Sequence, residues 1–130
     1  MRAAFMTSFA LLLQPALVPA QFTAQHSGTN AEFRGFSAVS TQVAWASGSG
    51  GTYARTVNGG QTWAADSVPG AGAMFFIDVH AVSDRVAYLV GTDFNGGYAA
   101  IYKTVDAGKT WLKQWDKRHA QVFIDGVAFW

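Results

Sequence analysis

The apolar residues that follow residue 20 alternate with polar ones or form short runs, and neither pattern has the 3.6-residue period of a helix. Residues 77–82 are apolar at alternate positions, and the polar tripeptide 83–85 after them has the composition of a turn. Residues 86–90 form a nearly continuous apolar run, which is typical of a strand buried on both faces. The pattern therefore predicts short strands joined by tight turns.

An octapeptide occurs twice in the chain, as TVNGGQTW at 56–63 and, 48 residues later, as TVDAGKTW at 104–111. Two tripeptides also recur. These are AVS at 38–40 and 81–83, spaced by 43 residues, and FID at 76–78 and 123–125, spaced by 47 residues. Self-similarity at such a period is the sequence signature of a repeat architecture.

Repeats of this length are characteristic of β-propellers, whose blades are four-stranded sheets. We therefore predict an all-β fold with two four-stranded blades, at about 33–66 and 75–116, and the first strand of a third at about 122–130. Such an incomplete propeller cannot close, so the remaining blades of a longer chain, or other copies of this chain, are expected to complete it. The expected strands of the first blade are 36–39, 43–46, 53–57 and 62–65, and those of the second are 77–82, 86–90, 98–105 and 110–115.

The repeated octapeptide has the residue types of a compact turn between two strands. The side-chain oxygen of Asn58 or Asp106 can accept backbone N–H bonds across its own turn. Asn keeps this acceptor and loses the charge, which suits a turn and would not suit a catalytic carboxylate. The residues to which we assign this structural role are Thr56, Asn58, Gly60, Trp63, Thr104, Asp106, Gly108 and Trp111.

The pattern Thr-x-Asp-x-Gly-x-Thr-Trp resembles the Asp-box of sialidases and other bacterial-neuraminidase-repeat propellers. Four further stretches resemble exported propellers of the photosystem II stability/assembly factor-like family: FRGFSAV at 33–39, VAWASG at 43–48, IYKTVD at 101–106 and FIDGVAFW at 123–130. The resemblance implies a propeller fold, an N-terminal fragment of a longer propeller, and a role in stabilising or assembling a partner complex.

Composition and charge exclude several classes of protein. Half of the residues are hydrophobic and only 13% are charged, which is far too apolar for a disordered chain. The net charge of +1 gives no basic field for nucleic acid. Cysteine is absent, so disulfides and thiolate metal sites are excluded.

The first 20 residues have the features of a secretory signal. Arg2 is followed by the apolar stretch 3–13, and small residues at 18 and 20 predict cleavage before Gln21, with 21–32 as a linker. The apolar stretch is too short to be a stable membrane span. We therefore expect export to the periplasm or the extracellular space.

A sialidase needs three arginines, a Tyr–Glu nucleophile pair and an aspartic acid/base, and its first arginine usually lies in an Arg-Ile-Pro motif. Here Arg34 is followed by Gly35 and Phe36, so we assign no catalytic residue. Asp78 and Asp125 recur at equivalent repeat positions, which indicates that they serve the first strand of a blade. The alternative is a secreted sialidase-like glycoside hydrolase whose active site lies in blades beyond this chain.

No metal or cofactor site is predicted. His26, His80 and His119 lack the spacing of metal ligands, and the glycine-rich stretch 48–51 lacks the Lys-Ser/Thr of a phosphate loop.

A basic and aromatic segment is the best candidate for binding. Its residues are Lys109, Trp111, Lys113, Trp115, Lys117 and Arg118. The odd numbering of the first five places them on one face of a regular strand, with Lys113, Trp115 and Lys117 as the candidate binding face. We therefore expect a non-enzymatic, exported module that binds a protein partner or a glycan.

Overall fold

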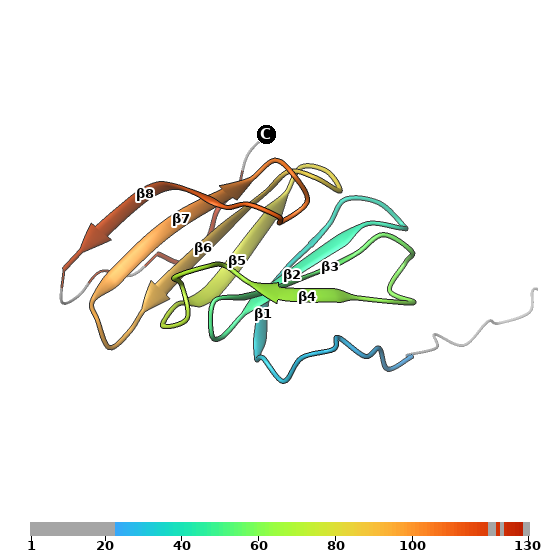
Figure 1. Cartoon of the computed structure of the whole chain (residues 1–130), viewed down its shortest axis with the longest axis horizontal. Coiled ribbons are helices and arrows are strands. Elements are labelled where there is room, and N and C mark those ends of the chain that lie inside the picture. Colours follow the sequence, from blue (N-terminus) through green and yellow to red (C-terminus); the bar gives the residue numbers. More distant parts are fainter. Residues whose placement is uncertain (1–22, 120–121, 123, 129–130) are drawn as a thin grey trace, which may run out of the picture.

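The computed structural model describes residues 23–119, 122 and 124–128, which form two four-stranded antiparallel sheets packed side by side (Figure 1). Blade 1 comprises β1 (Phe33–Ala38), β2 (Ala44–Gly48), β3 (Thr52–Thr56) and β4 (Ala64–Ser67), and blade 2 comprises β5 (Phe75–Ala81), β6 (Ala87–Asp93), β7 (Tyr98–Thr104) and β8 (Leu112–Arg118). Within each blade, every strand pairs with the strands next to it in the sequence. The predicted all-β fold of propeller blades is confirmed.

The two blades repeat each other in detail. The register between their first two strands shifts at equivalent positions, between Phe33 and Gly35 in blade 1 and between Phe76 and Asp78 in blade 2. Bulges of this kind bend a strand and increase its twist. The recurrence shows that this bend belongs to the repeated unit.

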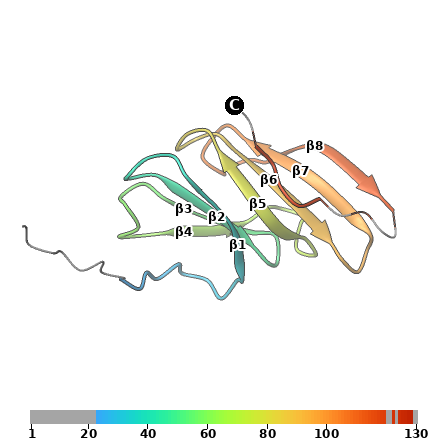
Figure 2. The ribbon, with the colours of Figure 1, turned by 180° about the vertical axis from the view of Figure 1, so that it is seen from behind.

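β1 and β2 of blade 1 lie beside β5 of blade 2 (Figure 2). The hydrophobic core lies mainly at this contact between the blades. Its buried members are Trp45, Tyr53, Val68, Ala71, Met74, Phe76, Val79, Ala87, Leu89 and Ala100. Burial of the larger aliphatic and phenylalanine side chains among them contributes about 1.5–3 kcal/mol each. Because cysteine is absent, this interblade core and the hydrogen bonds around it hold the two sheets together.

Side-chain hydrogen bonds also join the blades. The Trp45 indole N–H donates to the carbonyl of Ser83 at 3.0 Å, and the Ser37 hydroxyl accepts from the backbone N–H of Ala81 at 3.0 Å. The two sheets are therefore positioned by specific polar contacts as well as by apolar packing.

The segment predicted to begin a third blade lies against β5. The Asp78 carboxylate accepts from the N–H of Val79 and from that of Val127, both at 2.8 Å. Within 122 and 124–128, the part of this segment that is described, no residue is assigned to a strand. The third blade thus stays a prediction.

The predicted signal, 1–20, lies outside the described residues. Over the part of the chain that is described, the structure has no helix long and apolar enough to cross a membrane.

Candidate functional site

The second octapeptide turn, residues 104–111, is held together by Asp106 and Thr104. One carboxylate oxygen of Asp106 accepts from the hydroxyl of Thr104 at 2.8 Å and from the N–H of Thr110 at 2.9 Å. The Thr104 oxygen in turn accepts from the N–H of Gly108 at 3.0 Å. The aspartate therefore caps its own turn.

The first octapeptide turn, residues 56–63, has the same bonds with an amide in place of the carboxylate. The Asn58 side-chain oxygen accepts from the Thr56 hydroxyl and from the Thr62 N–H, both at 3.0 Å. The Thr56 oxygen accepts from the N–H of Gly60 at 2.9 Å. A side-chain oxygen is thus the shared requirement of the two turns.

The two turns differ in one bond and in its effect on charge. The Asn58 amide donates to the Thr62 hydroxyl at 2.9 Å, whereas the Thr110 hydroxyl donates to Asp106 at 2.6 Å. Donation by the Thr110 hydroxyl and N–H, with a further bond from Thr104, lowers the pKa of Asp106 from 3.8 to about 2. Asp106 is therefore held in its charged form at neutral pH.

The tryptophans that end the turns lie in different surroundings. The Trp111 ring lies between blades, with its centroid 5.0 Å from that of Tyr53 and 6.3 Å from that of Trp45. The Trp63 ring lies 6.5 Å from that of Phe36, which is 63% exposed, and its N–H donates to the Gln25 side chain at 2.8 Å. Only Trp111 is therefore part of the interblade core.

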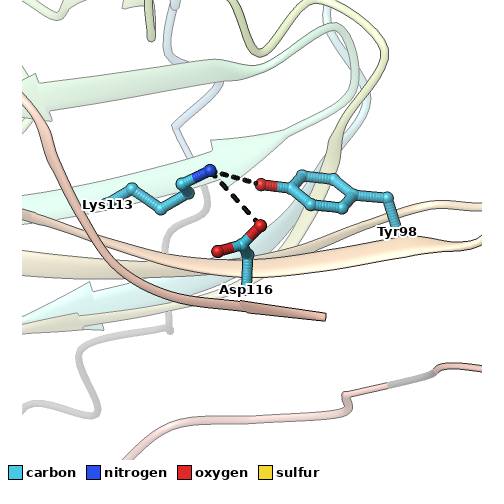
Figure 3. A network of polar contacts seen from close by, with 3 residues as sticks. All are labelled: Tyr98, Lys113 and Asp116. Atoms are coloured by element: carbon cyan, nitrogen blue, oxygen red, sulfur yellow. Dashed lines mark hydrogen bonds and ion pairs between the residues drawn. The ribbon is translucent and has the colours of Figure 1, made fainter. Parts of the chain in front are cut away.

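Cationic and aromatic side chains line the outer edge of blade 2 on both faces of its sheet. We call this edge the β8 rim and define it as Tyr98, Lys113, Trp115, Lys117 and Arg118. The Lys113 ammonium donates to the Tyr98 hydroxyl at 3.0 Å and pairs with Asp116 at 3.3 Å (Figure 3). These two contacts, the tyrosine first, raise the pKa of Lys113. The Arg118 guanidinium lies 4.6 Å from the Tyr98 ring centroid.

A bulge in β8 divides the predicted binding face. Lys113 pairs with Tyr102, and Trp115 pairs with Ile101, so the register skips Gln114. Because Ile101 and Tyr102 are adjacent in β7, they point to opposite faces of the sheet. The expectation from odd numbering is therefore wrong for Lys113. Lys113 lies on the face that carries Tyr98, and Trp115 and Lys117 lie on the other.

The other candidate residues have mostly structural contacts. Asp78 holds two backbone N–H groups, as described above, and Asp125 is exposed. The His26 ring accepts from the N–H of Gly28 at 3.1 Å. His80 lies in β5, and His119 follows β8. In residues 23–119, 122 and 124–128, no three His, Cys, Asp or Glu side chains gather to hold a metal ion.

A cleft that the sequence did not reveal lies on the outer face of blade 1. Its volume is about 270 Å³, and its walls include Phe36, Trp63, Arg34 and Gln25. The Arg34 guanidinium also lies 5.8 Å from the ring centroid of Phe75. Gln25 belongs to the segment that precedes β1 and has no periodic signal, so its place on this face is a consequence of tertiary structure.

Comparisons with known proteins support the fold. No protein-family model matches the chain, and no curated protein matches it. Among solved structures, the chain is similar to YCF48 bound to a D1 peptide, with a TM-score of 0.53 and 24% sequence identity over 65% of this chain. The chain spans about a quarter, 26%, of the length of that YCF48 chain. At this identity the similarity shows the fold alone, which is that of β-propeller blades.

Proposed function

We propose that this chain is an exported, non-enzymatic propeller module that binds an acidic, extended segment of a protein partner along its β8 rim. The observation that carries the proposal is the exposure of β8, in which all seven residues are exposed. β8 contains three cationic residues, Lys113, Lys117 and Arg118, and one acidic residue, Asp116. Tryptophan, tyrosine and arginine, the types of Trp115, Tyr98 and Arg118, are enriched among the residues that dominate binding.

The corresponding strand of blade 1 lacks these features. β4 has four residues, with one acid and no cation, and its largest side chain is that of Asp66. β8 has seven residues, including Trp115, which is 41% exposed. The blades share their fold, so the difference in their outer strands favours a specific role for β8.

The contacts of Tyr98 prepare the rim for an anionic partner. Lys113 and Arg118 both lie close to the Tyr98 ring, at 5.6 and 4.6 Å from its centroid. Cations held over a ring in this way lose less side-chain freedom when they bind a carboxylate. β8 is also an outer strand of its sheet, and such an edge can pair with an extended peptide.

A protein segment is favoured over a glycan because YCF48, which has the same fold, was solved with a peptide bound. Stabilisation or assembly of a partner complex is the role that we propose, on the resemblance of the sequence to photosystem II stability/assembly factor-like propellers. Export rests on the sequence of residues 1–20. Mass spectrometry of the chain recovered from a secreting host should give a product that begins at Gln21.

Binding can be tested with a fluorescein-labelled copolymer of glutamate and tyrosine and, in parallel, with neutral oligosaccharides. Lys113→Glu combined with Arg118→Glu should weaken copolymer binding about tenfold or more, because both cations would contact carboxylates. Arg85→Glu combined with Lys109→Glu makes the same change of charge and should have little effect, because Arg85 lies in another turn and Lys109, although part of the candidate segment, lies in the turn before β8 and outside the rim. Equal losses in the two double variants, or binding of the oligosaccharides alone, would overturn the proposal.

A further inference from the structure

The interface between the blades has two different sides. Blade 1 contributes what we call a front face, with Trp45, Tyr53 and Arg55 on β2 and β3. The Arg55 guanidinium lies 5.5 Å from the Trp45 ring centroid and donates to the carbonyl of Asp84 at 2.6 Å. The front face therefore combines aromatic rings with a cation that reaches a carbonyl of the next blade.

Blade 2 contributes what we call a back face, with Trp111 and nearby loop carbonyls. Trp111 packs against the Tyr53 ring, and the Tyr53 hydroxyl donates to the carbonyl of Gly108 at 2.8 Å. Burial raises the pKa of Tyr53, so its hydroxyl stays a donor at neutral pH. A back face therefore consists of the tryptophan that ends an octapeptide and of neighbouring backbone carbonyls, which accept hydrogen bonds from the front face.

Blade 2 repeats the front face on its far side. Tyr88 follows Trp45 by 43 residues, and Lys103 follows Arg55 by 48, which are the spacings of the repeat. The two residues pair across β6 and β7 as Trp45 and Arg55 pair across β2 and β3. The Lys103 ammonium lies 5.1 Å from the Tyr88 ring centroid. Trp45 is fully buried, whereas Tyr88 is half-buried, so the second front face is less deeply buried than the first.

Blade 1 repeats the back face on its own far side. Trp63 takes the place of Trp111, and Phe36, 63% exposed, takes the place of Val79, which is 3% exposed. A hypothetical Cβ on Gly60 would meet the Gln25 side chain, just as one on Gly108 would meet Tyr53. Gln25 therefore occupies the position in which a front face would place its tyrosine.

We propose that the back face of blade 1 docks onto the front face of blade 2 in a second copy of this chain. One chain carries both surfaces, and the contact between its own blades is a template for the docking. In that geometry Lys103 reaches the carbonyl of Thr41, the equivalent of Asp84, and Trp63 packs near Ile101, the equivalent of Tyr53. This inference goes beyond the proposed function and uses residues outside the β8 rim.

Docking requires two local segments to move. Gln25 gives up its bond to Trp63, and residues 124–128 give up the contact with Asp78. Because the front and back faces differ, the contact is head-to-tail, and such contacts either close into a ring or continue as a filament.

Sedimentation velocity of the chain without residues 1–20 tests this proposal. The chain should associate with increasing concentration, and Gln25→Ala should strengthen the association by freeing Trp63. Trp63→Glu and Lys103→Glu should each weaken it about tenfold or more. Lys109→Glu, which changes the charge of an exposed residue on the second turn, is the matched control and should leave association unchanged.

Mixing the two defective variants gives the sharpest result. Trp63→Glu retains an intact front face, and Lys103→Glu retains an intact back face. Together they should form a one-to-one complex and nothing larger. A chain that stays monomeric at every concentration, or a mixture that does not combine, would overturn the proposal. Loss of copolymer binding at the β8 rim would leave this proposal intact, because copolymer binding and self-association probe different residues.

Discussion

The two octapeptide turns have equivalent internal hydrogen bonds but different neighbours. In each, a side-chain oxygen at the third position, Asn58 or Asp106, accepts from a threonine hydroxyl and a backbone N–H. Trp111 then packs between blades, whereas Trp63 faces the cleft beside Phe36. The comparison shows that the turn builds the hairpin in both blades, and that its tryptophan stabilises the fold only where a neighbouring blade covers it.

The tryptophan pair should give the largest difference between the turns. Trp111→Ala removes a ring that packs on buried Trp45 and Tyr53, so we expect a loss of about 3–4 kcal/mol in the free energy of unfolding. Trp63→Ala removes a ring on an open face and should cost about 1 kcal/mol. Urea unfolding followed by circular dichroism measures both, and equal losses would show that the neighbouring blade is irrelevant.

The glycine pair should give a smaller difference. Gly60 and Gly108 have φ values of 83° and 90°, so alanine is strained at either position by about 1–2 kcal/mol. At Gly108 the added Cβ would also lie 2.7 Å from the Tyr53 ring, which is held in the core, whereas at Gly60 it would meet the mobile end of exposed Gln25. Gly108→Ala should therefore be the more destabilising variant by about 1 kcal/mol in the same unfolding assay. The opposite order would contradict the assignment of Tyr53 and Gln25 to equivalent positions.

Local sequence patterns were sufficient to predict the strands. Alternation over 77–82 and the turn residues at 83–85 depend on neighbouring positions only, and β5 and β6 lie on either side of that turn. Predicted ends differ by a few residues. Because the octapeptide turn includes Thr110 and Trp111, β8 begins at Leu112, and it ends at Arg118.

Contacts between distant residues could not be predicted in this way. The Tyr53–Gly108 bond joins residues 55 positions apart, and Gln25 reaches Trp63 from a segment without periodicity. The bulge at Gln114 depends on the pairing with β7, which is why Lys113 was assigned to the wrong face. The candidate segment was thus found from its composition, whereas its geometry required the structure.

Exchanging the side-chain acceptors of the two turns, Asn58 and Asp106, should have the smallest effect on stability. It is also the most direct test of the claim that these turns are structural. The pKa of Asp106 is about 2 in the folded chain and 3.8 as an ordinary value. Its contribution to stability is therefore complete above about pH 4 and is lost as the pH falls through about 2. Asp106→Asn should remove this contribution, and Asn58→Asp should add an equivalent one in the first turn.

Acid unfolding of the wild-type chain, Asp106→Asn and the double variant Asn58→Asp/Asp106→Asn makes the decisive comparison. We predict that the difference in stability between wild type and Asp106→Asn narrows as the pH falls from about 4 to 2, and that the double variant regains the wild-type slope in this range. All three chains should bind the copolymer equally at neutral pH. A folded Asp106→Asn chain that has lost binding or any measured activity would contradict the structural role of these turns.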